Sequence, residues 1–318
     1  MKNPLRKRFF RELREEIGKY LVVFILMAAT IGFVSGFLVA DGSMLTAYNN
    51  SFQKYNIEDG KFETEEKIYK NQQEDIEKKG VTLYENFYVE KALLNGTTLR
   101  IFKNRTEVDK VCLMKGRLPE KAGEIAIDRM YADNNKLSVG DSLQSGKRKW
   151  KITGLVALSD YSALFQNNND TMFDAVKFGA AVVTEEEFSS FNQSQLVYNY
   201  AWTYTHKPKT EAQEKKKSED FMEELSKDVT LEEFVPQYLN QAIHFTGDDM
   251  GGDRAMIIVL LYIVIAIMAF VFGITTSNTI RKEAGVIGTL RASGYTKNEL
   301  IRHYMFMPLL VTFIGAIV

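Results

Sequence analysis

The sequence has few residues that could form a disulfide, hold a metal or act as a catalytic group. Its 318 residues include one cysteine, Cys112, so the chain can form neither an internal disulfide nor a cysteine-based zinc site. The three histidines are scattered and lack the HExxH spacing of a zinc enzyme. No serine lies in a GxSxG pattern. A membrane-anchored hydrolase would need such a constellation and therefore finds no support.

An excess of charge of one sign is also absent. The net charge of -1 argues against a nucleic-acid-binding protein, which would carry a basic domain. Residues 140–147, GDSLQSGK, imitate a phosphate-binding loop, but Arg148 stands where a Ser or Thr must hold magnesium. Residues 248–253 lack the alternating acids of a calcium loop. We interpret 140–147 as a hairpin turn and expect no cofactor or metal bound by the chain itself.

Two long apolar runs contain no charged residue at all. Residues 20–40 and 256–277 are each about long enough to cross a ~30 Å hydrocarbon core as a helix. The first is too long for a signal peptide and has no cleavage site. It follows a basic segment, 1–19, which is predicted to be an amphipathic helix on the cytoplasmic membrane surface. We therefore expect transmembrane helices at 20–40 and 255–278, with the N-terminus in the cytoplasm.

Small residues recur at four-residue spacing in both predicted membrane helices. In lipid, such a face lets another helix approach closely, so that van der Waals packing drives association. The predicted packing residues are Ala28, Gly32, Gly36 and Ala40 in the first helix, and Ala269, Gly273 and Ser277 in the second.

Residues 41–254 are interpreted as an extracytoplasmic α+β domain inserted between the two spans. Asn95-Gly96 between two apolar runs is the strongest of its hairpin signals. The predicted fold class is a membrane protein with α-helical transmembrane segments and an inserted α+β domain. We expect helices over 64–79, after Thr184 and over 211–227, strands over 87–94, 97–102, 124–128, 179–183 and 197–204, a hairpin over 141–155, and a mobile loop at 166–170.

The polar segment 279–302 is wedged between the second apolar run and a third one at 304–318. Its basic residues place it on the cytoplasmic side. Apolar residues recur at helical spacing over 280–292, Ser293-Gly294 suits a helix stop, and 296–299 is a capping box. The segment is thus predicted to form a helix, a break and a second helix. The alternative is an ordinary basic loop.

Residues 281–296, RKEAGVIGTLRASGYT, resemble the signature of FtsX-like (MacB-type) ABC transporter permeases. Two departures from that pattern are an extra residue after Glu283, and Ser293 in place of an apolar residue. Motifs within 115–156 extend the resemblance to the MacB-like extracytoplasmic domain. In this family the elbow is similar to a coupling helix that docks on an ATPase subunit. The resemblance implies this role for Arg281, Lys282, Glu283, Ile287, Gly288, Leu290, Arg291, Ala292 and Gly294.

The resemblance also implies partners and a location. The chain would be a permease subunit without ATPase activity of its own, in a bacterial cell membrane, with several spans. A partner ABC ATPase would bind ATP and Mg, and its hydrolysis would move the extracytoplasmic domain, a mechanism called mechanotransmission. A second permease copy or half and the lipid bilayer are the other expected partners, together with an extracytoplasmic protein or peptide. The resemblance does not identify the cargo, that is, the substrate of the transporter.

The alternative function is a two-span receptor with an extracellular ligand-sensing domain. It explains the first 277 residues nearly as well, but a receptor would continue into a cytoplasmic module, whereas this chain returns to an apolar run at 304–318. That run is short for a span. We therefore expect 303–318 to be the start of a third membrane helix, and the chain to be a fragment of a permease with at least four spans.

Overall fold

The computed structural model describes residues 4–317. The chain divides into two compact units, and each is considered by itself. The helical unit comprises the residues up to 45 and those from 250 onward, and the α+β unit comprises 46–249. Helices α1 (Pro4–Lys54) and α6 (Gln241–Lys282) each contribute residues to both units, so the helices continue past the predicted domain limits at 41 and 254.

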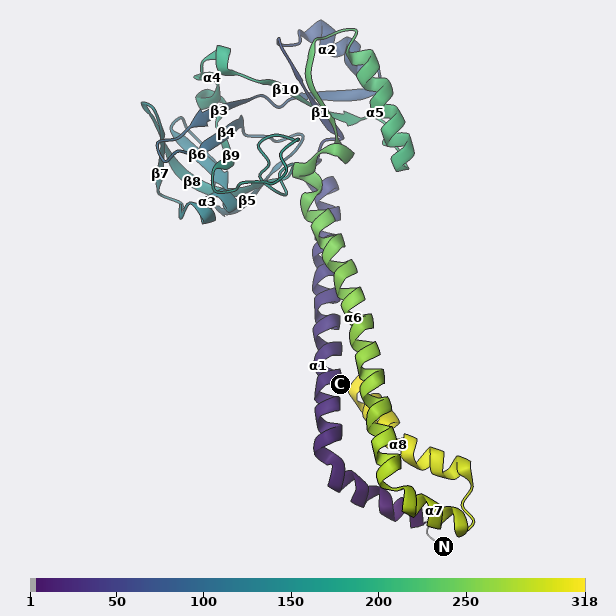
Figure 1. Ribbon diagram of the computed structural model, residues 1–318. Coiled ribbons are helices and arrows are strands. Elements are labelled where there is room, and N and C mark those ends of the chain that lie inside the picture. The colour runs from purple at the N-terminus through teal and green to yellow at the C-terminus, as the bar shows by residue number, and fades with distance from the viewer. Residues whose placement is uncertain (1–3, 318) are drawn as a thin grey trace. The chain divides into compact units, whose positions relative to one another are not determined.

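The helical unit is built from α1, α6, α7 (Ala284–Ala292) and α8 (Lys297–Ile317). Three segments are long and apolar enough to cross a membrane: Tyr20–Lys54, Gln241–Lys282 and Lys297–Ile317. The first turns of α1 lie at an angle to the rest of that helix, and α7 reverses the chain so that α8 runs back (Figure 1). Helix α8 begins earlier than the predicted 303, because the capping box at 296–299 starts it.

Helices α1 and α8 are in contact inside the helical unit. A Cβ atom on Gly315 of α8 would collide with the side chain of Met27 of α1, and Met27 itself is buried. The absence of a side chain at Gly315 therefore permits the close approach, as small residues do in membrane helices.

The first sheet of the α+β unit is antiparallel, and helix α5 covers it. The ring of Phe221 in α5 lies 5.3 Å from that of Trp202 and 6.4 Å from that of Phe62, so α5 (Glu211–Leu225) buries the middle of the sheet. Its strand order is β11-β1-β10-β2, with β1 (Gly60–Thr64), β2 (Val81–Glu85), β10 (Tyr198–Tyr204) and β11 (Leu231–Pro236).

The predicted helix over 64–79 is wrong in its first part. Phe62 and Thr64 are buried on one face of β1, which pairs with β10 on one side and β11 on the other. The sheet thus takes the backbone hydrogen bonds that a helix starting at Thr64 would need. Helix α2 covers only Lys70–Glu77. The turn that follows the helix ends at Gly80, whose φ of 89° favours glycine.

The second sheet is mixed, with the order β3-β4-β9-β6-β8-β5 and with β7 paired to β8. The hairpins predicted around Asn95-Gly96 and over 141–155 are confirmed as β3/β4 and β7/β8. The other predicted strands and the helices after Thr184 and over 211–227 are also present. The remaining elements are β3 (Tyr88–Ala92), β4 (Thr98–Lys103), β5 (Val111–Gly116), β6 (Glu124–Asp128), α3 (Arg129–Asn134), β7 (Ser142–Ser145), β8 (Arg148–Leu158), β9 (Phe178–Val183) and α4 (Glu185–Ser189), with 3-10 turns at Gln193–Gln195 and Gln237–Leu239.

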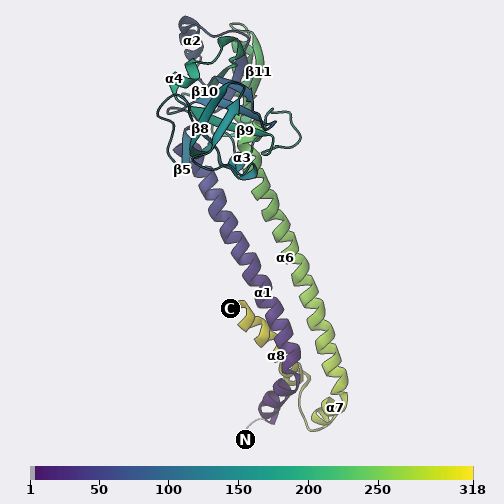
Figure 2. The same cartoon turned by 90° about the vertical axis from the view of Figure 1, so that its left-hand side faces the viewer.

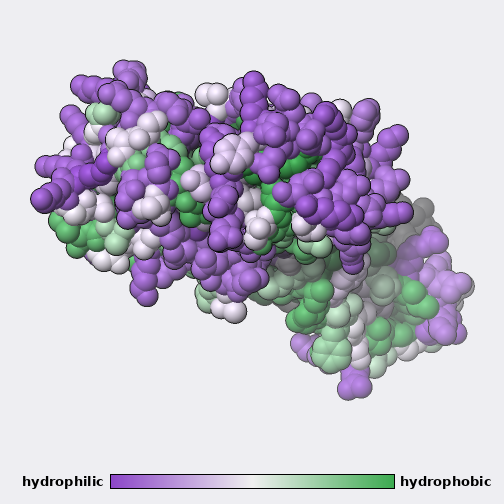
Figure 3. Space-filling model, turned by 90° about the horizontal axis from the view of Figure 1, so that it is seen from above, coloured by the Kyte–Doolittle hydropathy of each residue, from purple (hydrophilic) through white to green (hydrophobic). Residues whose placement is uncertain are grey.

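The two sheets share one hydrophobic core and are joined by the chain that crosses from β2 to β3. The amides of Asn86 and Tyr88 donate to the carbonyls of Asn199 and Val197, at 2.9 and 3.3 Å. Both sheets can be followed in the turned view of Figure 2. Hydrophilic side chains cover most of the nearer face seen from above, with small hydrophobic patches between them (Figure 3).

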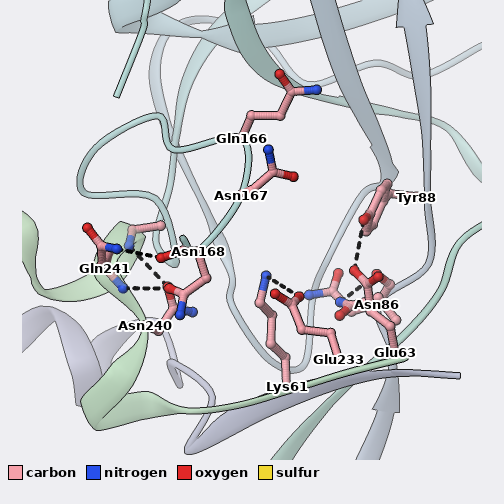
Figure 4. A network of polar contacts seen from close by, with 12 residues as sticks. Lys61, Glu63, Asn86, Tyr88, Gln166, Asn167, Asn168, Glu233, Asn240 and Gln241 are labelled. Carbon is pink, nitrogen blue, oxygen red and sulfur yellow. Dashed lines mark hydrogen bonds and ion pairs between the residues drawn. The ribbon is translucent and has the colours of Figure 1, made fainter. Parts of the chain in front are cut away.

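The loop predicted to be mobile, 166–170, is held at one point. Asn168 accepts a hydrogen bond from the backbone amide of Gln241 at 2.9 Å and donates one to the carbonyl of Leu239 at 3.0 Å (Figure 4). The loop is therefore attached to the residues that start α6.

Candidate functional site

The candidate site is the elbow formed by the end of α6, α7 and the start of α8. Arg281 and Lys282 occupy the last turn of α6, where cations are favourable at a helix C-terminus. The helix predicted from residue 280 onward is interrupted at Glu283, which is the N-cap of α7. Arg281 and Lys282 therefore belong to α6, and only the predicted residues from Ile287 to Ala292 lie in α7. This is a correction to the single helix expected over 280–292.

Glu283 is fixed by a contact that its own helix does not supply. Its carboxylate accepts a hydrogen bond from the hydroxyl of Tyr304 in α8, while its backbone carbonyl accepts the amide of Ile287 at 2.9 Å. The break between α6 and α7 is thus tied to α8. Tyr304 was not among the predicted site residues, and only its amphipathic side chain at the start of an apolar run would have suggested such a role.

Gly294 ends α7 in the way that its sequence predicts. The amide of Gly294 donates to the carbonyl of Arg291 and that of Tyr295 donates to the carbonyl of Leu290, both at 3.1 Å. This pair of hydrogen bonds is a Schellman motif, and the φ of 98° at Gly294 is the left-handed conformation that the motif requires. The guanidinium of Arg291 also donates to the carbonyl of Tyr295 at 3.1 Å.

The start of α8 is capped as predicted. The amide of Thr296 donates to the carboxylate of Glu299 at 2.8 Å, and the amide of Glu299 donates to the hydroxyl of Thr296 at 3.3 Å. These reciprocal bonds satisfy two of the free donors at the helix start. Together with the stop at Gly294, they fix the turn between α7 and α8 through side chains that are all local in sequence.

The elbow encloses a hollow of about 340 Å³ whose walls come from α6, α7 and α8. Ile287 contributes to it from α7, whereas Gly288 and Ala292 are exposed on α7 and Leu290 is half-buried. Arg291 and Lys297 add positive charge to the apolar walls. An apolar side chain next to an acidic one would fit these surroundings. The lining residues are Thr276, Ile280, Ile287, Arg291, Lys297, Leu300, Ile301, Tyr304 and Met305.

The predicted small-residue faces lie apart from the contacts within the helical unit. A Cβ atom on Gly32, Gly36 or Gly273 would meet nothing within 4 Å. Helix α1 instead buries Val23, Met27 and Val34. Of the remaining predicted packing residues, Ala40, Ala269 and Ser277 are exposed and Ala28 is half-buried. The small-residue faces are therefore open in the single chain.

Comparison with known protein families assigns the elbow and its flanking helices. Residues 258–318 match the FtsX-like permease C-terminal family. This segment is similar to the FtsX-like permeases. The matched segment contains every residue predicted for coupling, from Arg281 to Gly294, and it favours the permease over the two-span receptor, because it covers the part of the chain that the receptor interpretation leaves unexplained.

Two solved structures are similar to parts of this chain. The crystal structure of the periplasmic region of MacB from Actinobacillus actinomycetemcomitans has 11% identity and a TM-score of 0.35, covering 56% of this chain and 87% of that one. The extracellular domain of the noncanonic ABC-type transporter YknZ from Gram-positive bacteria has 10% identity and a TM-score of 0.32, covering 55% of this chain and 98% of that one. No curated protein matches the chain.

The matched segment is similar to permeases, and the chain has three helices long and apolar enough to cross a membrane. Among the residues that the structure describes, no group of three or more His, Cys, Asp or Glu side chains could hold a metal ion.

Proposed function

We propose that the chain is the permease subunit of an ABC transporter, and that α7 is the helix through which a partner ATPase acts on it. In this proposal the N-terminus and α7 lie in the cytoplasm of a bacterial cell and the α+β unit lies outside. ATP hydrolysis in the partner would move α7, and α1 and α6 would carry that movement to the α+β unit. The charge pattern supports this orientation, since Arg281, Lys282 and Arg291 are all exposed at the elbow.

The observation that carries the proposal is the way both ends of α7 are fixed. At its start, Glu283 is bonded to Tyr304 of α8, and at its end the Schellman motif at Gly294 sets the turn. A short helix that is held at both ends moves as one body with its neighbours. A push on α7 would therefore reach α6 and α8, whereas a flexible loop would absorb it.

The hollow beside α7 provides a site of contact for the ATPase. Ile287 and Arg291 both line it, and Leu290 is half-buried beside them on α7. We expect an apolar side chain of the ATPase to enter the hollow and an acidic one to pair with Arg291. Charge pairs of this kind set specificity and orientation at an interface.

The open small-residue faces of α1 and α6 would take a second permease copy or half. Gly32, Gly36 and Gly273 leave room for a helix backbone to approach. The other exposed apolar side chains of these helices would face lipid. The α+β unit would then be the part that contacts an extracytoplasmic protein or peptide.

Charge reversal at the elbow tests the role of α7. Arg291→Glu should uncouple the ATPase, so that the co-purified ATP-hydrolysing subunit no longer responds to the full-length permease in lipid nanodiscs. A change of at least about tenfold in the kcat of ATP hydrolysis is expected if one close charge pair at the interface becomes repulsive. The measurement is ATP turnover with and without each permease variant.

Arg291→Lys is the matched control, because it keeps the charge and loses only the bidentate geometry and the bond to Tyr295. It should retain most of the coupling. Equal coupling in the wild type and in Arg291→Glu, with the variant correctly inserted, would argue against α7 as the contact.

A further inference from the structure

Three carboxyl groups and one guanidinium are buried in the α+β unit where α1 ends. Glu58, Asp109 and Asp160 are 1%, 0% and 7% exposed, and Arg105 is 8% exposed. They come from different segments: Glu58 precedes β1, Arg105 and Asp109 lie between β4 and β5, and Asp160 follows β8. The cluster therefore joins the end of α1 to the second sheet.

Asp109 holds the segment 104–110 against the end of α1. Its carboxylate accepts the backbone amide of Glu58 at 2.9 Å, and its own backbone amide donates to the carbonyl of Asn56 at 3.0 Å. The amide of Lys110 donates to the carbonyl of Tyr55 at 2.9 Å. These bonds attach the first residues after α1 to the loop that leads into β5.

The charges in the cluster do not balance. Both terminal nitrogens of Arg105 bond the two oxygens of Asp160, at 2.8 and 2.6 Å, so these two residues form a neutral pair. Glu58 and Asp109 are left without a bonded cation of their own. The other facing cation is Lys61, whose ammonium points to Glu233, at 3.9 Å (Figure 4).

The hydrogen bonds around Glu58 point to a protonated carboxyl group. One carboxyl oxygen accepts the side-chain amide of Asn240 at 3.3 Å, while the other, Oε2, is buried without a partner. A buried carboxyl group with one donor and no bonded cation is costly to ionise, so its protonated form is favoured. Asp109, in contrast, accepts the backbone amide of Glu58 and the side-chain amide of Asn86, at 2.9 and 3.3 Å.

The environment keeps that proton bound at pH values where a carboxyl group is normally ionised. Burial, followed by the nearby charge of Asp160, raises the pKa of Asp109 to about 7. Burial and then Asp109 raise the pKa of Glu58 well above its usual value, against the opposing effects of Lys61 and Arg105. Two adjacent buried carboxyl groups cannot both ionise without strong repulsion.

We propose that the buried carboxyl groups of Glu58 and Asp109 together retain a proton and form a pH-sensitive clasp, which holds the segment 104–110 to the end of α1 in acid and loosens as the pH rises to neutrality. On deprotonation, the O–H bond breaks, the proton passes to water and two carboxylates remain side by side. Their repulsion favours local opening, in which water reaches both groups. The compartment whose pH is sensed depends on the proposed topology, but the clasp itself does not.

The sign and size of the effect follow from proton linkage. The native state of the clasp holds a proton that the opened state releases, because the pKa of Asp109 is raised from 3.8 to about 7. The stability that this proton gives the closed clasp is therefore fully present below pH 3.8, and it is lost as the pH rises toward about 7. Each pH unit in this window changes the opening equilibrium by about tenfold.

Hydrogen exchange of the full-length protein in detergent tests the clasp without any ATPase. After correction for the intrinsic pH dependence of exchange, the protection of the amides of Glu58, Asp109 and Lys110 should fall about tenfold per pH unit between about pH 5 and pH 7. Local amides are needed, because burial also raises the pKa of Asp128 to about 6 and adds its own pH dependence to global stability.

Asp109→Asn replaces a titrating carboxyl group by a neutral amide and suits the φ of 46° at this position. In this variant the protection of the local amides should change by less than about threefold across the same pH range. Glu58→Gln provides a second variant in case the first does not fold. Asp133→Asn, whose side chain is 61% exposed, is the control and should keep the wild-type slope.

A flat profile in the wild type would overturn the proposal, as would an unchanged slope in both clasp variants. Neither result bears on the role of α7, which is read out by ATP turnover. Conversely, a failure of Arg291→Glu to uncouple the ATPase would leave the exchange result intact.

Discussion

At the residue scale, Glu187 combines a local and a long-range role. The sequence around Thr184 predicts a helix cap, and the amide of Glu187 does donate to the hydroxyl of Thr184 at 3.2 Å. The carboxylate, however, crosses to β8, where it accepts the indole N–H of Trp150 at 2.8 Å and a guanidinium N–H of Arg148 at 3.1 Å. It also accepts the amide of Gly123 at 3.0 Å. No local pattern indicates these partners.

Glu187→Ala should lower the free energy of unfolding by about 2–4 kcal/mol, because it leaves the fully buried indole N–H of Trp150 without an acceptor. Urea unfolding of the full-length protein in detergent, followed by the fluorescence of the two tryptophans, measures the change. Glu186→Ala is the control, since Glu186 is exposed in the same turn, and it should shift the free energy by less than about 0.5 kcal/mol. Equal losses in both variants would contradict a special role for the buried carboxylate.

At the scale of elements, the accurate predictions are those with a local cause. The hairpin at Asn95-Gly96, the stop at Gly294 and the capping box at 296–299 each depend on a few neighbouring residues. The errors arise where distant segments decide. β1 replaces the start of the predicted helix over 64–79 because β10 and β11 flank it.

The same division applies to the elbow. Its turn and its second helix could be predicted from 293–299 alone. The break at Glu283 could not, because the hydrogen bond that accompanies it comes from Tyr304 in another helix. No sequence pattern indicates the buried clasp, for the same reason: Glu58, Asp109 and Asp160 come from separate segments and meet only in the folded unit.

Gly294→Ala tests how far the Schellman motif fixes α7. A side chain at a φ of 98° is strained, and the cost of about 1–2 kcal/mol should reduce the exchange protection of the amides of Gly294 and Tyr295, or their replacements, by about tenfold. Gly288→Ala is the matched control, because its Cβ atom would meet nothing within 4 Å and the residue lies inside the helix. It should leave this protection unchanged or raise it slightly. Comparable losses in the two variants would mean that any added side chain disturbs α7.

At the scale of the whole molecule, the two units present different surfaces to their surroundings. The helical unit exposes large apolar side chains such as Val39, Phe270 and Ile317, each 70% exposed, as expected for helices that face lipid. The α+β unit instead encloses its apolar side chains in one core. The proposed topology puts the α+β unit outside the cell and the elbow of the helical unit in the cytoplasm.

Cysteine accessibility in intact cells tests this orientation. Cys112→Ser removes the native thiol, and single cysteines are then introduced by Lys147→Cys in the β7/β8 turn or by Ser293→Cys at the end of α7, two positions that are both exposed. A membrane-impermeant maleimide added from outside should label the first and not the second. Labelling of the second after permeabilisation is the control for its reactivity. If Ser293→Cys were labelled in intact cells, α7 would lie outside, no cytoplasmic ATPase could reach it, and the basic residues of the elbow would need another partner.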